Sequence, residues 1–201
     1  MMVELGVSTC IFYLPRLLDF IGDKSFSKYD LSNTRVLLVI GSMLTREIYD
    51  RIETAFMETH GTTPIIVSGY GSTELGSFPL RCGLFDSREA RINTVGQCMH
   101  QGACRIRNVE TGELINDPNI VGEVELFSPF KMIGYVGHEP VVDFWKMGDL
   151  GQYDENGYVV LVGRIKEQIT LRNTKKTNDT TIDLEVQKCG CITEIATISK
   201  R

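Results

Sequence analysis

Apolar and polar positions in the first third of the chain follow two different periods. A continuous apolar run, VLLVI, covers residues 36–40, and a second run, PIIV, covers residues 64–67. Between the two runs, apolar residues recur every four positions, at Leu44, Ile48, Ile52 and Phe56, and Gly61 follows them. Continuous runs are typical of strands covered on both faces, and the four-residue spacing is typical of one helix face. Residues 34–67 are therefore predicted to form a strand–helix–strand unit.

An earlier helix is predicted from Pro15 onwards. The segment PRLLDFIGD carries apolar residues at positions 17, 18, 20 and 21, and its proline stands at a favourable first helical position.

The pattern changes after Arg91, where helical spacing gives way to short alternating runs separated by turns. ACRIRNV (103–109) and GEVELFS (122–128) are connected through ETGE and the turn NDPN. Asn156-Gly157 lies between two alternating arms, which is a strong hairpin signal. Residues 92–163 are predicted to form a small antiparallel sheet or barrel. The expected fold class is α/β followed by a small antiparallel β-barrel.

Composition narrows the choice of partners. Apolar residues make up 42% of the 201-residue chain and charged residues 23%, with a net charge of −5. An acidic chain without a basic stripe argues against nucleic acid or an anionic membrane as the main partner. No apolar run approaches the roughly 20 residues of a transmembrane helix, and the N-terminus lacks the features of a signal peptide. We expect a cytoplasmic location.

The six cysteines are dispersed and are predicted to be reduced thiols. Cys98, His100 and Cys104 lie close in sequence, but a zinc site needs about four ligands. A metal site at these residues is not predicted.

Residues 68–74, SGYGSTE, are the first candidate for chemistry. Glu74 stands where a dinucleotide fingerprint requires its third glycine, and no Gly-Lys-Ser/Thr occurs for a Walker-type phosphate loop. The residue types fit another use. Ser68, Gly69 and the second glycine are small enough for a flat base to lie against the backbone, and Tyr70 offers a ring for stacking. A solvated turn with a buried tyrosine stays open for this segment alone.

The residues that end this segment could bind the phosphate groups of a nucleotide. The Thr73 hydroxyl can donate to a phosphate oxygen, and the Glu74 carboxylate can hold Mg²⁺. Downstream, Asp149 follows a glycine just before the predicted hairpin, and Arg164 and Lys166 follow the hairpin. A carboxylate can accept hydrogen bonds from two neighbouring ribose hydroxyls, and a guanidinium can bond ribose or phosphate.

In this order and spacing, the segments resemble the adenylate-forming superfamily of acyl-CoA synthetases, 4-coumarate-CoA ligases and luciferases. Five segments carry the likeness: LVIGSMLTREI (38–48), SGYGSTE (68–74), GEVELFSPFKMIGY (122–135), WKMGDLGQYDENGYVVLVGR (145–164) and IKEQI (165–169). The resemblance implies that residues 1–91 are the α/β portion of an AMP-binding domain. It makes 92–163 an antiparallel subdomain and 164–201 a hinge with an incomplete C-terminal lid.

The resemblance also implies roles for individual residues. Ser68, Gly69 and Tyr70 would border adenine, Asp149 would hold the ribose and Arg164 would bond the nucleotide. Thr73 would touch the α-phosphate, and Glu74 would coordinate Mg²⁺. Lys166 would be the hinge of the lid, and Gly41, Ser42 and Gly76 would contribute small residues to the acyl pocket.

The implied reaction has two steps and uses ATP, Mg²⁺ and coenzyme A. A carboxylic acid attacks the α-phosphate of ATP to give an acyl-adenylate and pyrophosphate, and the thiol of coenzyme A then displaces AMP. Full-length relatives of this kind can be peroxisomal, but no such signal is present here.

Two parts of the family pattern are missing from these 201 residues. No Ser/Thr/Gly-rich loop with a phosphate-binding lysine is present, and neither Lys188 nor Lys200 matches the context of the adenylation lysine. We therefore expect a fragment of an acid–CoA ligase that is inactive alone. The alternatives are a non-catalytic module that binds an adenine nucleotide or a partner, and an unrelated α/β protein. The acid substrate and the oligomeric state are not predicted.

Overall fold

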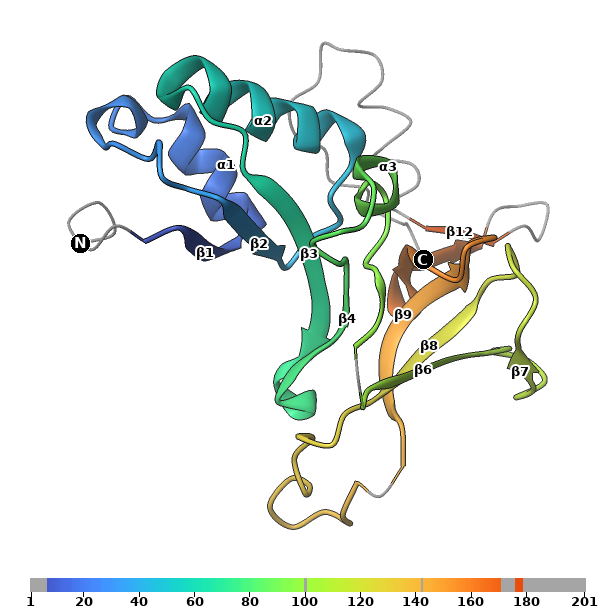
Figure 1. The fold of residues 1–201 in the computed structure, drawn as a ribbon. Helices are drawn as coiled ribbons and strands as arrows, with labels where there is room; N and C mark the ends of the chain where they lie inside the picture. Colours follow the sequence, from blue (N-terminus) through green and yellow to red (C-terminus); the bar gives the residue numbers. More distant parts are fainter. Residues whose placement is uncertain (1–6, 100, 142, 171–175, 179–201) are drawn as a thin grey trace.

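Two five-stranded sheets lie side by side in the computed structural model, which describes residues 7–99, 101–141, 143–170 and 176–178 (Figure 1). The first sheet has the order β1-β2-β3-β4-β5, and the second has the order β10-β9-β8-β6-β7. A two-stranded pair, β11 (Gln168–Thr170) and β12 (Lys176–Asn178), follows the second sheet. Most of the predicted lid lies outside the described residues, as do Lys188, Lys200 and the last two cysteines.

The first sheet begins with three parallel strands, β1 (Thr9–Tyr13), β2 (Val36–Ile40) and β3 (Ile65–Ser72). Antiparallel strands β4 (Ser77–Arg81) and β5 (Gln97–Cys98) extend it beyond β3. The strand–helix–strand prediction for residues 34–67 is confirmed. The sequence pattern gave no strand before Pro15, yet β1 pairs with β2 along its whole length.

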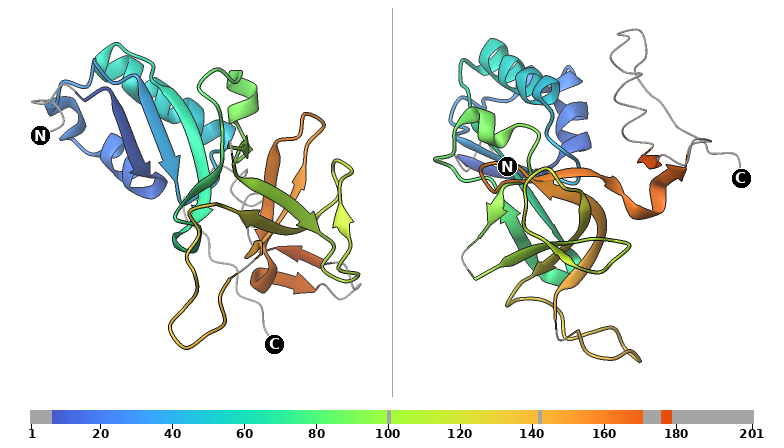
Figure 2. Two further views of the ribbon diagram at one scale, coloured as in Figure 1. Left: turned by 60° about the horizontal axis from the view of Figure 1, so that its bottom comes forward. Right: turned by 90° about the vertical axis from the view of Figure 1, so that its right-hand side faces the viewer.

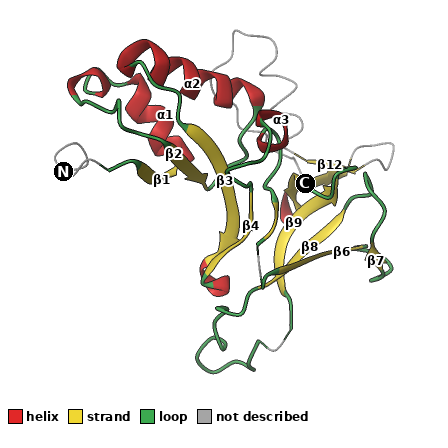
Figure 3. Cartoon of the chain, viewed as in Figure 1, coloured by secondary structure: helices red, strands yellow, loops and turns green. Residues whose placement is uncertain are grey.

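The two predicted helices form as α1 (Leu14–Gly22) and α2 (Arg46–His60). The short α3 (Arg88–Arg91) and the 3-10 turns η1 (Phe26–Lys28), η2 (Thr73–Leu75) and η3 (Ile165–Glu167) were not predicted. The Thr45 hydroxyl caps α2 by accepting from the Ile48 amide, and Gly61 ends the helix with a left-handed φ of 63°. Helices α1 and α2 lie on the same side of the parallel strands (Figure 3).

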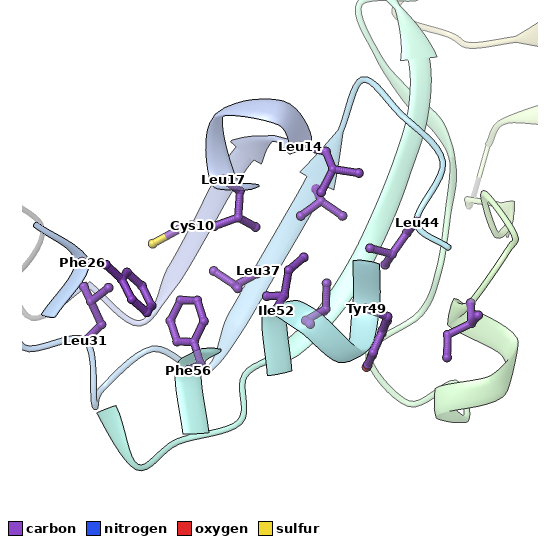
Figure 4. Close-up of a cluster of buried hydrophobic side chains, with 13 residues drawn as sticks. Cys10, Leu14, Leu17, Phe26, Leu31, Leu37, Leu44, Tyr49, Ile52 and Phe56 are labelled. Carbon is purple, nitrogen blue, oxygen red and sulfur yellow. The ribbon is translucent and has the colours of Figure 1, made fainter. Parts of the chain in front are cut away.

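A hydrophobic core fills the space between these helices and the sheet (Figure 4). Leu37 and Val39 of β2 are fully buried there against Leu17 of α1 and Ile52 and Phe56 of α2. The helical stripe of the sequence is thus the buried face of α2, and Leu44, just before the helix, joins the same core.

The other face of β2 is only partly covered, contrary to the expectation from its continuous apolar run. Leu38 and Ile40 are half-buried, and Ile11 and Tyr13 of neighbouring β1 are 61% and 53% exposed. Parallel sheets are normally covered on both faces. Within the described residues, α1 and α2 cover one face, and this leaves the alternate side chains of β1 and β2 in contact with solvent.

The second sheet is antiparallel, as predicted. Its strands are β6 (Ala103–Arg107), β7 (Leu114–Ile115), β8 (Gly122–Phe127), β9 (Trp145–Tyr153) and β10 (Val159–Arg164). The Asn-Gly turn joins β9 to β10, and Gly157 there has a φ of 78°. The described strands form an open sheet with β10 and β7 at its edges, so closure into a barrel is not confirmed.

Residues 68–72, for which the sequence left a solvated turn open, are a continuation of β3. β4 pairs with it antiparallel, Gly69 opposite Arg81 and Tyr70 opposite Leu80, with a bulge before Ser72. A side chain at Gly71 would put its Cβ 2.3 Å from the Ser77 carbonyl oxygen. The glycine is therefore needed because the backbone of β4 crosses here at close range.

A second hydrophobic core joins the two sheets. It packs Leu75 and Leu80 from the β3–β4 hairpin against Val124 and Leu126 of β8 and Val159 of β10. The two views of Figure 2 show the hairpin lying between the helical layer and the second sheet. In the described part of the chain, no helix is both long and apolar enough to cross a membrane.

His60 makes the stability of this fold sensitive to pH. The centroid of its ring lies 4.5 Å from that of Phe26, and its Nε2 is buried without a hydrogen-bond partner among the described residues. Burial lowers the pKa of His60, although the charge of Asp30 acts in the opposite direction. The unfolded chain therefore binds a proton at this residue at a higher pH than the folded chain does.

We predict that the free energy of unfolding falls as the pH drops below about 6.5, the ordinary histidine pKa, and that His60→Leu reduces this fall. Urea unfolding between about pH 8 and pH 5 would measure the difference between the variant and the wild type. Because the variant keeps all other titrating groups, equal pH dependence in both proteins would contradict the assignment. His138→Leu, at an exposed histidine, is the matched control.

Candidate functional site

Three residues that are far apart in the sequence meet where the first sheet lies against the second. The Tyr70 hydroxyl of β3 donates a hydrogen bond to Oδ2 of Asp149 on β9. Arg164, at the end of β10, places its Nε 2.9 Å from Oδ1 of the same carboxylate. The structure thus brings Tyr70, Asp149 and Arg164 into one group.

The pairing of β9 with β10 positions the two charged members. Arg164 lies directly opposite Asp149 in the register, after a bulge between Leu161 and Gly163. Gly148, just before the aspartate, has a φ of 70°, a backbone conformation that favours glycine. The backbone conformation of Gly148 and the β9–β10 hairpin together direct the Asp149 carboxylate toward β3.

The two charged side chains of this group differ strongly in their exposure to solvent. The Asp149 side chain is 10% exposed, whereas that of Arg164 is 61% exposed. Burial, followed by the neighbouring Asp149 charge, raises the pKa of Tyr70, so its hydroxyl stays protonated and acts as a donor. The carboxylate is held on one side by a fixed buried donor and on the other by a cation that solvent can reach.

Glu74 belongs to a second group, further along the same interface. The Tyr135 hydroxyl donates to Glu74 Oε1 at 2.5 Å, and the Met132 amide donates to the Glu74 carbonyl at 2.7 Å. The Tyr135 hydrogen bond lowers the pKa of Glu74. The Tyr135 ring lies 6.4 Å from that of Trp145 at the start of β9. The carboxylate is therefore ionised, ordered by a loop from the second sheet, and accessible.

Sequence reasoning did not assign roles to Tyr135 and Trp145. Tyr135 ends the Gly-Tyr pair of the segment 122–135, and Trp145 begins the segment that contains Asp149. Both were visible as parts of recognised segments. Their contact with Glu74 or with each other depends on the path of the 129–144 loop, which no local pattern predicts.

The remaining candidate residues of the 68–74 segment differ in their burial and in their contacts. Ser68 is 2% exposed, and its hydroxyl donates to the Thr94 carbonyl at 3.0 Å beside the Cys82 thiol. Gly69 is buried, and a Cβ there would lie 3.2 Å from the Leu38 side chain. Thr73 is exposed at the start of η2, where its carbonyl accepts the Gly76 amide. Ser68 and Gly69 thus support the strand from within, and Thr73 presents its side chain to solvent.

The proposed acyl-pocket residues do not share one location. Gly41 and Ser42 are exposed after β2, and a Cβ on Gly41 would overlap the Tyr13 ring. Gly76 follows η2 with a φ of 65°, close to the Phe130 backbone. A largely apolar pocket of about 240 Å³ opens beside Gly76, lined by Leu38, Phe78, Met99 and Phe130 among others. Gly41, Ser42 and Gly76 itself are not among the residues that line it.

Lys166 lies in η3, directly after β10, and is exposed. It therefore stands between the second sheet and the β11–β12 pair, at the point where the predicted hinge begins.

The donor set at Glu74 fits Mg²⁺ only with help from a ligand. Within the described ranges, no group of three or more His, Cys, Asp or Glu residues could hold a metal ion. Mg²⁺ is commonly held by one or two carboxylates together with substrate phosphates and water. A single exposed carboxylate such as Glu74 suits an ion that arrives with a nucleotide.

Comparison with known proteins agrees with this geometry. Residues 3–136 match the family model described as AMP-binding enzyme. The probable 4-coumarate–CoA ligase 2 of Dictyostelium discoideum is 36% identical over 151 residues, which are 71% of this chain and 26% of that protein. The chain spans about a quarter of the length of this and other curated relatives that it matches.

Solved structures show the same fold. An O-succinylbenzoate coenzyme A synthetase from Bacillus subtilis, in complex with ATP and magnesium, matches 96% of this chain and 39% of its own, with a TM-score of 0.76 and 17% identity. An anthranilate CoA ligase in complex with anthranoyl-AMP matches 90% of this chain and 34% of its own, with a TM-score of 0.71 and 18% identity. Because residues 3–136 match the model of this family, the chain belongs to the AMP-binding enzyme family.

Proposed function

We propose that this chain is the adenosine-recognition part of an ATP-dependent acid–CoA ligase. The single observation that carries the proposal is the meeting of Tyr70, Asp149 and Arg164 around one buried carboxylate. Buried charges are costly and are usually retained for a purpose or well paired. Here two sequence segments of the family pattern, 68–74 and 145–164, converge on this charge from two separate sheets.

The carboxylate of Asp149 is proposed to bind the ribose hydroxyls. Each of its oxygens already accepts one bond, from Tyr70 or from Arg164, and each retains a further lone pair. Because Arg164 is largely exposed, it can turn from the carboxylate toward a nucleotide phosphate or ribose without uncovering a buried cation. Tyr70, held by its buried hydroxyl, keeps Asp149 in place while Arg164 moves.

Glu74 and Thr73 are proposed to face the phosphates. Thr73 is exposed and could donate its hydroxyl to the α-phosphate, and Glu74 would be the residue that holds Mg²⁺, which would neutralise phosphate charge. Ser68 and Gly69 would shape the adenine side of the site through the backbone of β3. Gly41, Ser42 and Gly76 are proposed to line the acyl pocket, and Lys166 to act as the hinge of the lid.

The reaction of the complete enzyme would be adenylation followed by thioester formation. An acid carboxylate attacks the α-phosphorus of ATP, the bond to the β-phosphate oxygen breaks, and pyrophosphate leaves. The thiol of coenzyme A then attacks the acyl carbon, a proton leaves the thiol, and AMP is released. Negative charge develops at phosphorus in the first step, so Mg²⁺ and cationic side chains are the expected sources of stabilisation.

On its own, the chain is proposed to be inactive in adenylation. The phosphate-binding loop and the adenylation lysine have no counterpart in these residues. Groups that stabilise developing charge contribute about 3 to 4 kcal/mol each, or roughly a hundred- to thousand-fold in rate. The second candidate function is a non-catalytic adenine-nucleotide module, which the buried and ordered Asp149 group favours because it does not depend on the missing loop.

We predict that the chain binds AMP through Asp149 and that Asp149→Ala loses about tenfold or more in affinity, since hydrogen bonds to a charged group contribute about 1.5–3 kcal/mol. Isothermal titration calorimetry with AMP would measure the change, with Asp149→Asn as a variant that preserves volume. Asp117→Ala, at an exposed loop carboxylate, is the control. Equal affinities in the wild type and both Asp149 variants would remove the ribose assignment.

A second prediction concerns catalysis. Pyrophosphate exchange into ATP by the isolated chain should stay at background in the presence of Mg²⁺ and a carboxylic acid, while an acyl-adenylate analogue still binds. Exchange above background that is lost in Asp149→Ala would show a complete site and would contradict the proposed inactivity. Absence of both exchange and binding would favour a fragment that needs the rest of the enzyme.

A third prediction tests the support given by Tyr70. Tyr70→Phe removes the buried donor to Asp149 and should lower the free energy of unfolding by about 1.5–3 kcal/mol, the range for hydrogen bonds to charged groups. Urea unfolding measures this loss, and Tyr13→Phe, at an exposed tyrosine, is the matched control. If Tyr70→Phe unfolded like the control, the Tyr70–Asp149 bond would not be stabilising the interface.

A further inference from the structure

An arginine lies in the wall of the largely apolar pocket beside β4. The pocket has a volume of about 240 Å³, and its apolar wall includes Leu38 of β2, Phe78 and Pro79 of β4, and Phe130 of the loop after β8. Arg81, the last residue of β4, also lines it and is the only charged residue among the described residues that do so. The pocket therefore combines apolar surface with one positive charge.

Arg81 has no anionic partner within the described ranges. The residue opposite it on β3 is Gly69, which has no side chain, and the residue opposite it on β5 is Gln97, whose amide nitrogen donates to the Asn156 carbonyl at 2.8 Å. The ion pairs between described residues do not include Arg81. An anionic group bound in the pocket could thus pair with this guanidinium without displacing any of these contacts.

The opposite end of the pocket carries hydroxyl groups. Ser77, the first residue of β4, and Ser128 both line the pocket, and their Oγ atoms lie 3.1 Å apart. Ser77 directly follows Gly76, which is proposed for the acyl pocket, and the η2 turn that contains Glu74. Four steps of extended strand separate Ser77 from Arg81, roughly 13 Å between their Cα atoms. The pocket therefore extends along β4, from the residues proposed to face the phosphates to a positive charge.

We propose that the acid bound in this pocket carries a second anionic group and that Arg81 pairs with it. The inference rests on the proposed function, since the reacting carboxylate would lie at the Ser77 end, nearest to Glu74. The second group would lie at the far end of β4. A guanidinium presents its donors in one plane and matches the two oxygens of a carboxylate. Arg81 would be a specificity-determining residue, which selects acids by the group at their far end.

The volume of the pocket limits the body of the acid. An apolar cavity of about 150 Å³ is large enough to bind benzene. A pocket of about 240 Å³ therefore accommodates on the order of ten carbon atoms, such as one ring with a short chain. The rings of Phe78 and Phe130 in the wall favour an aromatic body. The substrate class is thus an arylalkanoic acid with a second carboxylate on its ring.

Two acids that differ only at the far end test the proposal. They are 3-(4-carboxyphenyl)propanoate and 3-(4-methylphenyl)propanoate, and each is titrated into the full chain at neutral pH and followed by ligand-observed NMR. We expect the diacid to bind about fivefold more tightly than the methyl compound, which is the upper range for an exposed ion pair. Equal affinities of the two acids for the wild type would overturn the proposal.

Variants of the arginine separate its charge from its geometry. Arg81→Gln should lose the preference for the diacid, and Arg81→Lys should keep only part of it, because an ammonium group lacks the planar fork. Arg35→Gln, at an exposed arginine that does not line the pocket, is the matched control and should discriminate like the wild type. Circular dichroism verifies that each variant is folded. A preference for the diacid that persists in Arg81→Gln would also overturn the proposal.

AMP binding distinguishes a failure of this inference from a failure of the proposed function. The affinity for AMP and its loss in Asp149→Ala depend on the adenosine-recognition residues, whereas the comparison of the two acids depends on Arg81. If AMP binds through Asp149 and the acids bind equally, the inference about Arg81 is wrong and the proposed function stands. If the diacid preference requires Arg81 but AMP does not bind, the ribose assignment is wrong and the role of Arg81 in acid binding is supported.

Discussion

The fold depends on how β3 connects two sheets that have separate cores. Its first half is a parallel strand under α1 and α2, and its second half, from Ser68 to Ser72, carries the β3–β4 hairpin onto the second sheet. The hydrogen bond from Tyr70 to buried Asp149 fixes this contact in orientation, because a carboxylate taken out of water must find a partner. The same bond holds the residue proposed to bind ribose.

Stability and the proposed function therefore use the same atoms. The buried side of Asp149 is fixed by Tyr70, while its accessible side is paired with Arg164, which solvent reaches. The Glu74 carboxylate is held in a similar way. It accepts a hydrogen bond from Tyr135 and is partly exposed to solvent. Each of these two carboxylates is thus held by a tyrosine from another part of the chain. This arrangement preorganises the site before a ligand arrives.

One face of the parallel sheet is left with exposed Ile11 and Tyr13, and the chain spans about a quarter of the length of its relatives.

The glycines of the SGYGSTE segment are explained by packing within the chain. Gly71 permits the close crossing of β4, and Gly69 packs against Leu38 and Phe78. A segment chosen for a role at a ligand is here also required by strand packing, and both uses favour small residues.

The sequence by itself determined the elements whose signals are local. The four-residue stripe and Gly61 predicted α2, the apolar runs predicted β2 and part of β3, and Asn156-Gly157 predicted the β9–β10 hairpin. Ordered motifs also identified the family and led to the proposal of Tyr70, Asp149 and Arg164 as site residues. Tertiary structure alone decided that 68–72 is a strand, that β1 joins the sheet, and that the second sheet is open. It also decided that Tyr135 reaches Glu74, because this contact depends on a partner distant in sequence rather than on local periodicity.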